Sequence, residues 1–320
     1  MDIGILLYIV SLLTTGGIYA VLALGLNIQW GFTGLMNIGI AGFFAVGAYN
    51  SAILTTPASP AYLGGFDLPV AVGWIAAMAV AGLLAWPIGK IALRLRADYL
   101  AICTIGIAEI LRLVLKNEGW LTNGARGIDG LPRPFDGLAP EASQFAFLAL
   151  VLAVVAAIYL ALQRAHASPW GRMMRAVREN ETAAAAMGKD VERRRLEAFI
   201  LGSMVMGLGG ALMAHFFKFI GPEATDPLLA TFLVWVMLIL GGSGNNKGAI
   251  VGALVVWLIW SATEFLTDTL PADWAVRAKY LRVFLVGLFL QVILRVRPEG
   301  LLPERAPKQP AAPAGKDEPT

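Results

Sequence analysis

The sequence predicts an all-α, polytopic integral membrane protein with about nine membrane segments. Hydrophobic residues make up 58% of the 320 residues, whereas typical soluble domains reach about 45–50% even when glycine is counted. Charged residues amount to only 15% and stand in clusters. The uncharged run over residues 3–48 exceeds the ~20 residues that one spanning helix needs. That run alone is long enough for two passes.

Apolar stretches delimited by charges, Pro and Gly give the expected helices in order along the chain. They cover residues 3–27, 34–56, 68–93, 99–117, 143–163, 197–220, 228–242, 249–268 and 279–295. The first stretch lacks the basic start of a signal peptide and is too long for one, so we expect it to be retained. In the sixth, Ser203, Gly207 and Ala211 recur every four positions, a spacing that lets membrane helices pack closely. Residues 1–303 are thus expected to form one membrane domain, followed by a disordered tail over 304–320 that is rich in Pro, Ala and charge.

The distribution of basic residues predicts the orientation in the membrane, because short cytoplasmic loops carry an excess of Lys and Arg. The loop over 164–196 carries Arg164, Arg172, Arg175, Arg178, Lys189, Arg193, Arg194 and Arg195. The loop over 118–141 instead has Arg126 and Arg133 against Glu118, Asp129, Asp136 and Glu141. We therefore expect the first loop inside and the second outside. Alternation through the segments then places the N-terminus outside and the C-terminus inside.

The residue inventory excludes several classes of function. The net charge of +3 is small, and the basic residues stand beside apolar runs, which argues against nucleic-acid binding. One cysteine, Cys103, and two histidines, His166 and His215, leave no catalytic triad and no multi-cysteine metal site. We expect a chain that is not an enzyme and that binds no metal or cofactor itself.

The segment over 25–39 is the first that is informative about function. Asn27, Gln29, Thr33 and Asn37 interrupt an otherwise apolar sequence there, and polar groups at membrane depth are costly unless they are satisfied. The glycines between them would allow a discontinuous helix whose backbone faces protein or a wet cavity. These four residues are candidates for lining a pathway. The alternative is that this stretch contains only a short cytoplasmic loop, and the sequence leaves both interpretations open.

A second Gly-rich stretch over 240–248 stands between apolar runs in the other half of the chain, and the two stretches could be related repeats. Ser243 and Asn245 are its pathway candidates. It is not a phosphate-binding P-loop, because that motif needs Gly directly before Lys, and here Asn246 precedes Lys247. Any dependence on ATP must therefore come from another polypeptide.

Ionisable residues within the apolar segments have ordinary structural explanations. Glu109 and Arg112 are three positions apart, so they share a helix face and can neutralise each other as an ion pair. His215 and Lys218 lie near the external end of an expected helix, where solvation at the membrane interface is the ordinary explanation. The alternative is a role in binding a proton or a ligand.

A short helix is expected within the basic loop, with Asn180 as its N-cap and Gly188 as its terminator. Its four alanines favour a helix of ~10 Å, which is too short to be stable alone in water. Contacts with the rest of the chain or with a partner must hold it. The alternative is an ordinary connecting helix.

Several of these segments together resemble the permease subunits of the Liv-type branched-chain amino acid ABC importers, in particular the larger M-type member. The likeness covers most of residues 15–303. It is carried by GLNIQWGFTGLMNIG (25–39), GAY (47–49), DYLAICTIG (98–106), EILR (109–112), LTNGARGI (121–128), GRMMRAVRENETAAAAMG (171–188) and LGGSGN (240–245). The ordered co-occurrence of these stretches makes the match specific.

The resemblance implies a permease subunit that translocates branched-chain or other hydrophobic amino acids across a bacterial inner membrane. It also implies a second homologous permease, two cytoplasmic subunits that bind ATP, and a periplasmic substrate-binding protein. The stretch that resembles the ATPase-coupling helix of the family consists of Glu179, Asn180, Glu181, Thr182, Ala183, Ala184, Ala185, Ala186, Met187 and Gly188. Related permeases serve urea, short amides or aromatic acids, and no residue separates these substrates here. The rival class is a secondary transporter, for which Glu109 is the obvious coupling carboxylate.

Overall fold

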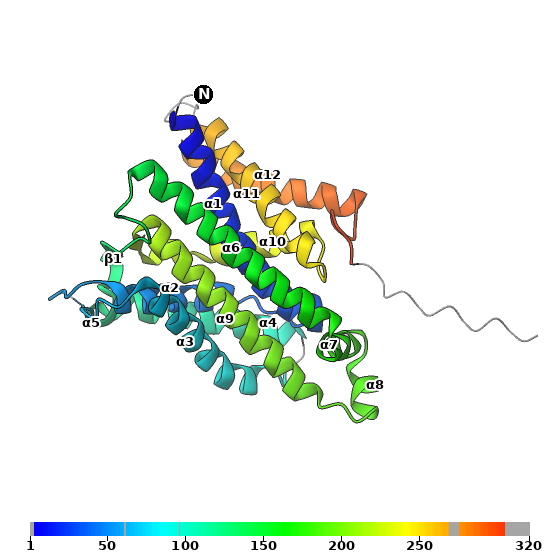
Figure 1. Cartoon of the computed structure of the whole chain (residues 1–320). Helices are drawn as coiled ribbons and strands as arrows, with labels where there is room; N and C mark the ends of the chain where they lie inside the picture. The colour runs from blue at the N-terminus through cyan, green and yellow to red at the C-terminus, as the bar shows by residue number, and fades with distance from the viewer. Residues whose placement is uncertain (1–2, 61, 96, 269–274, 305–320) are drawn as a thin grey trace, which may run out of the picture.

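The computed structural model describes residues 3–60, 62–95, 97–268 and 275–304 (Figure 1). The described chain is mostly helical. The helices are α1 (Ile3–Leu26), α2 (Ile40–Thr55), α3 (Val70–Ala92), α4 (Ala97–Asn117), α5 (Gly119–Thr122), α6 (Pro140–Ala167), α7 (Pro169–Glu179), α8 (Glu181–Ala186), α9 (Val191–Phe217), α10 (Leu233–Gly241), α11 (Asn246–Asp268) and α12 (Ala275–Val296). Shorter elements are η1 (Asn27–Gly31), η2 (Gly124–Arg126), η3 (Pro222–Thr225), η4 (Leu228–Phe232) and the antiparallel strands β1 (Ile128–Asp129) and β2 (Phe219–Ile220). Apart from Glu304, the expected tail lies outside the described residues.

Each expected apolar segment coincides with a helix, but nine full passes are not confirmed. In the described part, five helices are long and apolar enough to cross a membrane, and they cover Ile3–Gly31, Val70–Ala92, Pro140–Ala167, Val191–Phe217 and Asn246–Glu264. Helix α2 and the η4–α10 unit are too short, at roughly 21–24 Å against a ~30 Å hydrocarbon core. Helix α4 has the length but carries Asp98, Glu109, Arg112 and Lys116, which lower its hydropathy.

Helix α9 lies at the centre, packed against α1, α2 and α3. Its small residues permit this, as the four-residue spacing predicts. A Cβ added to Gly207 would meet Ala81 of α3 at 2.6 Å, and one added to Gly47 of α2 would overlap the backbone of Gly207. A larger side chain at either glycine would therefore force these helices apart.

The far end of α9 corrects the sequence interpretation of His215. We expected solvation at the membrane interface, but the side chain is fully buried. Its Nε2 lies 2.8 Å from Ser51 Oγ and its Nδ1 lies 2.7 Å from the carbonyl oxygen of Pro132. The loop around β1 folds over this helix end and shields it, which hydropathy alone does not reveal. Lys218 does remain at the surface, paired with Asp136 at 2.7 Å.

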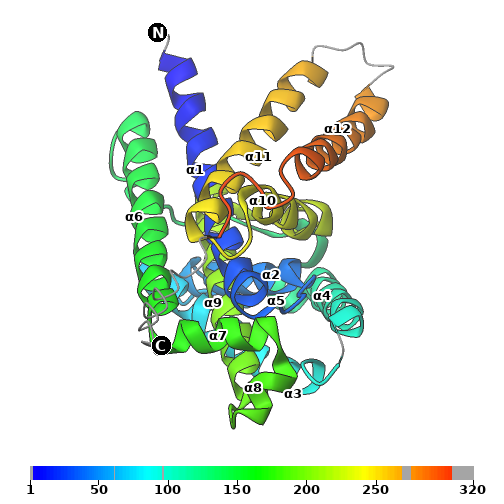
Figure 2. The same ribbon diagram turned by 90° about the vertical axis from the view of Figure 1, so that its right-hand side faces the viewer.

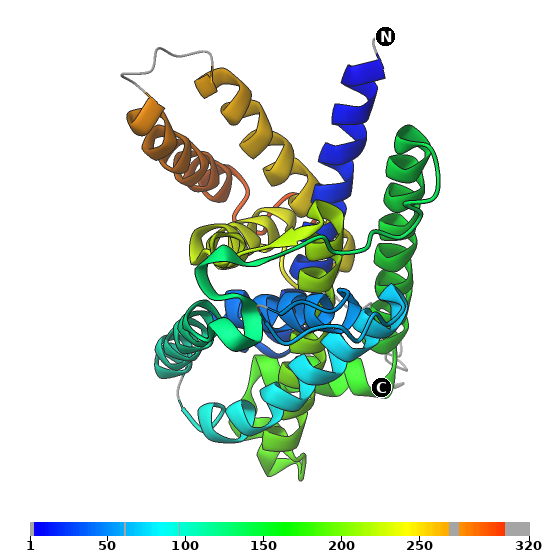
Figure 3. The ribbon, with the colours of Figure 1, turned by 90° about the vertical axis from the view of Figure 1, so that its left-hand side faces the viewer.

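Different helices extend toward the two opposite ends of the molecule. The start of α1 and the distal part of α11 extend toward one end, whereas α7 and α8 lie toward the other (Figures 2 and 3). The basic loop and the N-terminus are thus well separated in space. Which side of the membrane each end faces stays a prediction.

Candidate functional site

The two Gly-rich stretches form breaks between helices, and the breaks contact each other. Helix α1 continues through the π-helical turn η1 and ends near Thr33, and helical structure resumes at Ile40. The second break separates α10 from α11. Asn27 joins them: its Oδ1 accepts from the backbone N–H of Gly244 at 2.9 Å, and its Nδ2 donates to Asn246 Oδ1 at 2.9 Å. Residues 217 to 219 positions apart thereby share one buried amide.

A second buried network fastens the first break to α9. Gln29 donates from Nε2 to the carbonyl oxygen of Phe199 at 2.8 Å and to Ser203 Oγ at 3.2 Å. Its Oε1 accepts from Asn37 Nδ2 at 2.8 Å, and Asn37 Oδ1 in turn accepts from the backbone N–H of Gly39. Both side chains are fully buried. The Asn37 amide therefore gives a partner to one backbone group of the break, the N–H of Gly39, and the Gln29 amide joins the break to α9.

The structure thus brings the predicted pathway residues of the first stretch close together, but their side chains are buried in the protein interior. Asn27, Gln29, Thr33 and Asn37 are buried, and Thr33 donates to the carbonyl oxygen of Gln29. Their direct contact with a pathway stays a prediction, and what the geometry shows is support of the broken backbone. In the second stretch Ser243 is exposed.

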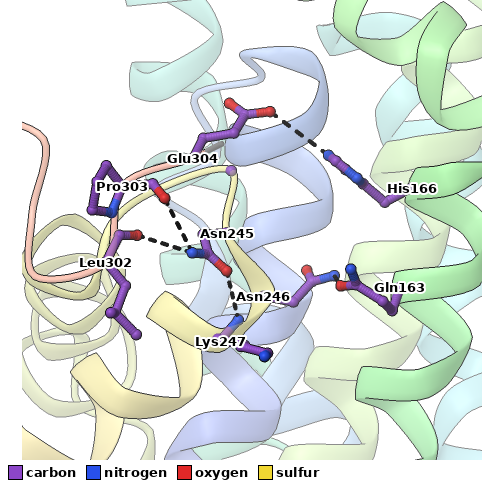
Figure 4. Close-up of a pocket in the computed structure, with 9 residues that line it drawn as sticks. Gln163, His166, Asn245, Asn246, Lys247, Leu302, Pro303 and Glu304 are labelled. Carbon is purple, nitrogen blue, oxygen red and sulfur yellow. Dashed lines mark hydrogen bonds and ion pairs between the residues drawn. The ribbon is translucent and has the colours of Figure 1, made fainter. Parts of the chain in front are cut away.

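Asn245, the other candidate of the second stretch, holds the C-terminal segment. Its Nδ2 donates to the carbonyl oxygens of Leu302 and Pro303 at 3.1 and 3.2 Å (Figure 4). It lines a cavity of about 460 Å³ together with His166 and Glu304. This cavity lies beside the basic loop, and its lining residues Gly244 and Asn246 are the ones that contact Asn27 of the first break.

A furrow of three adjoining hollows runs along one face of the molecule. The loop-side hollow, of about 450 Å³, lies between α4 and η3; the middle hollow, of about 560 Å³, lies between the first break, α4 and η4–α10; the α8-side hollow, of about 330 Å³, reaches Glu181. Arg112 lines both the loop-side and middle hollows, and Met36 lines both the middle and α8-side hollows. The hollows therefore adjoin one another in a series from the loops around η3 to the basic loop.

The middle hollow has a predominantly apolar wall. The residues that line it are Met36, Ile38, Ala41, Ile105, Ala108, Glu109, Arg112, Pro227, Leu228, Thr231, Phe232, Trp235 and Ile239. The first break shapes the wall directly, since the Asn37 carbonyl oxygen accepts from Trp235 Nε1 at 3.0 Å. The start of α2 contributes as well, because the backbone N–H of Ala41 donates to Thr231 Oγ1 at 3.0 Å. The wall residues of η4 and α10 escaped the sequence analysis, because their run is apolar apart from Thr231 and carries no periodic signal.

Glu109 and Arg112 are the ionisable residues among those that line the middle hollow. The predicted ion pair is confirmed: Arg112 Nε lies 2.9 Å from Glu109 Oε2, and Nη2 lies 2.5 Å from Oε1. The side chains are 25% and 38% exposed, for Arg112 and Glu109 respectively. The pair is therefore open to the furrow rather than enclosed by the chain.

The short helix expected in the basic loop is present as α8. Asn180 caps it, with its Oδ1 accepting from the backbone N–H of Ala183 at 2.9 Å, and Gly188 follows with a positive φ of 74°. Ala184 is buried against the chain, whereas Ala185 is exposed and Met187 is 79% exposed. Apart from Glu181 and Thr182 in its first turn, the exposed part of α8 is thus small and apolar, and the exposed Met187 follows it.

Arg178, at the end of α7, links this loop to the first break. Its Nη1 donates to the carbonyl oxygen of Gly31, and its Nη2 pairs with Glu304 Oε2 at 2.8 Å. Burial by itself raises the pKa of Glu304, but contacts with His166 and Arg178 outweigh it, so the pKa lies below its ordinary value. A movement of α7 would therefore pull on the η1 turn and on the C-terminal segment together.

Comparison with known proteins decides the family. The family model described as "Branched-chain amino acid transport system / permease component" matches residues 8–294. This chain belongs to that permease family. Among the residues that the structure describes, no group of three or more His, Cys, Asp or Glu side chains is placed to hold a metal ion.

Individual relatives confirm the resemblance to the M-type subunit of this permease family. The chain is 32% identical to the high-affinity branched-chain amino acid transport system permease protein LivM of Escherichia coli (strain K12), over 93% of this chain and 71% of that protein. It is 28% identical to the probable LivM of Methanocaldococcus jannaschii, over 90% and 91%. With the LivH permease of Salmonella typhimurium it shares 25% identity, over 90% and 92%. No solved structure gives a significant match.

Proposed function

We propose that this permease forms one half of the translocation path of an ATP-driven importer for branched-chain or other hydrophobic amino acids. The furrow is the observation that carries the proposal. Its three hollows share Arg112 and Met36 and follow one another from the loops around η3 to the loop that carries α8. A second, homologous permease subunit facing this surface would close the furrow into a path.

The middle hollow supports a hydrophobic substrate. Its volume of about 560 Å³ lies within the range of ~300–1,000 Å³ that is usual for small-molecule sites. An aliphatic side chain would gain from leaving water for such a wall. Urea and short amides would instead leave most of this wall without a complementary group, so we place them second.

Energy would come from two cytoplasmic ATP-binding subunits that dock on α8, while a periplasmic substrate-binding protein delivers the amino acid from the opposite side. Arg178 supports a coupling between the ATP-binding subunits and the furrow, because it connects the α7–α8 region with the Gly31 carbonyl oxygen at the first break. A motion imposed on α8 thus has a mechanical route to the wall of the furrow. No step of this cycle requires chemistry from the permease itself.

The rival reading, a secondary transporter, has less support. Such a protein needs a carboxylate at depth that can bind and release the coupling ion. Glu109 is the carboxylate among the residues that line the middle hollow, and Arg112 engages both of its oxygens. Because Arg112 already neutralises Glu109, a bound coupling cation would leave this pair with an excess positive charge.

An importer of this design places the loop after Gly130 in the periplasm and α8 in the cytoplasm, with the N-terminus periplasmic and the C-terminus cytoplasmic in the inner membrane. Reporters that are active on only one side, fused after Gly130 and after Ala185, should therefore report opposite sides. A fusion after Lys90 serves as a second cytoplasmic control, because Lys90, Arg94 and Arg96 stand together at the end of an apolar run and also predict the inside. If the Gly130 and Ala185 fusions report the same side, the proposed direction of the furrow is wrong.

A further inference from the structure

We propose that Glu109 and Arg112 form a subsite for the charged ends of a zwitterionic amino acid whose side chain lies in the middle hollow. This inference rests on the proposed function and names the residues that would recognise the backbone of the substrate. Glu109 would accept hydrogen bonds from the α-ammonium group. Arg112 would donate to the α-carboxylate group.

The ion pair leaves Arg112 with free N–H donors and Glu109 with free lone pairs. Arginine carries five N–H donors, and the contacts with Glu109 engage the Nε and one Nη2 donor. The remaining Nη donors are enough for a two-point contact with a carboxylate, the geometry that guanidinium favours. Each carboxylate oxygen of Glu109 accepts one bond from Arg112 and has a further lone pair for an ammonium group.

The position of the pair favours a ligand-binding role over a purely structural one. A pair that only neutralises itself needs no opening, yet the Glu109 side chain is 38% exposed and both residues line the middle hollow. Arg112 also lines the loop-side hollow. An amino acid that enters from the loops would therefore meet the guanidinium before its side chain reaches the apolar wall.

The arrangement of charge also selects a class of substrate. Two opposite charges side by side match a molecule that carries both an ammonium and a carboxylate group close together. Urea and short amides carry neither charge, and an aromatic acid without an amino group would leave Glu109 unmatched and repel it. The large apolar hollow beside the pair has room for side chains of several sizes. The pair would therefore bind the ammonium and carboxylate groups that all amino acids share, and it would not select the size of the side chain.

The test uses the complete complex of this permease, its partner permease, the ATP-binding subunits and the binding protein, reconstituted in liposomes and supplied with labelled leucine. The decisive variant exchanges the two residues, Glu109→Arg together with Arg112→Glu, which keeps an ion pair but reverses its polarity. The subsite predicts a fall in leucine uptake of at least about tenfold, the loss expected from misplacing one charged hydrogen-bond partner. The amount of assembled complex and the ATPase activity stimulated by the binding protein should stay within about twofold of wild type.

Asp98→Asn is the matched control, because Asp98 is an exposed charge on the same helix that lines none of the three hollows. If the exchanged pair does not assemble, the variant Glu109→Gln with Arg112→Gln, which retains a neutral pair of hydrogen-bonding groups, takes its place with the same expectation. Leucine uptake within about twofold of wild type in the assembled variant overturns the subsite and leaves a structural ion pair. Absence of ATP-driven leucine uptake by the wild-type complex would instead contradict the proposed function itself.

Discussion

Replacing Gln29 with leucine should destabilise the folded permease, because the buried Asn37 amide loses the acceptor that it contacts at 2.8 Å. Leaving a buried donor without a partner costs about 1–3 kcal/mol, and the contact between Gln29 and the α9 carbonyl of Phe199 is lost as well. We expect a lower midpoint of thermal unfolding in detergent and less folded complex after purification. Uptake per folded transporter should change much less, since Gln29 lies behind the wall of the furrow.

Ser243→Leu is the control for this prediction. It is the same kind of replacement at an exposed position of the other Gly-rich stretch, so its effect on stability should stay within about 0.5 kcal/mol. The opposite pattern for Gln29→Leu, with normal folding and lost uptake per transporter, would show that the amide contacts the substrate. In that case the first interpretation of the sequence would hold and the supporting role would be wrong.

A bulky residue on the free face of α8 should weaken binding of the ATPase subunits. Ala185 is exposed beside Met187, and its small side chain would allow close approach of a partner groove. If the contact is packed like a protein core, Ala185→Trp should cost about 1–3 kcal/mol, or roughly 5- to 140-fold in affinity. The measurement is the affinity of the purified ATPase subunits for the permease pair in detergent, together with ATP hydrolysis stimulated by substrate and binding protein.

The position within α8 matters for this experiment. Ala184 is unsuitable because it is buried against its own chain, and a large residue there would disturb the loop itself. Ala139→Trp, at an exposed position before α6 in the loop predicted to be external, is the matched control. Equal ATPase affinity for the Ala185→Trp and Ala139→Trp variants, or full association of both, would show that α8 is only a connector.

Local features were the most predictable from the sequence. Apolar runs gave the positions of the helices, and the cap at Asn180 and the terminator at Gly188 followed from the backbone chemistry of those residue types. The ion pair of Glu109 and Arg112 followed from helical spacing. Each of these depends on residues that are close together along the chain.

Features that depend on distant segments were not predictable. The contact between Asn27 and Asn246 joins segments that are 219 positions apart in the sequence, and no local pattern specifies it. The furrow is assembled from the first break, α4 and η4–α10, whose apolar side chains look the same whether they face lipid, protein or a hollow. Hydropathy likewise did not show that α2 and α10 are too short to span a membrane. The length of each helix depends on where the neighbouring break ends it, and an apolar run does not reveal that position.

Uptake of labelled leucine into liposomes that contain the complete complex tests the central claim most directly. We expect uptake only when ATP is present on the side of α8 and the loaded binding protein is on the opposite side, and we expect it to persist when ion gradients are collapsed. Variants of the ATP-binding subunits that cannot hydrolyse ATP should abolish it. Leucine uptake by this permease reconstituted without any ATP-binding subunit, driven by an ion gradient alone, would contradict the account.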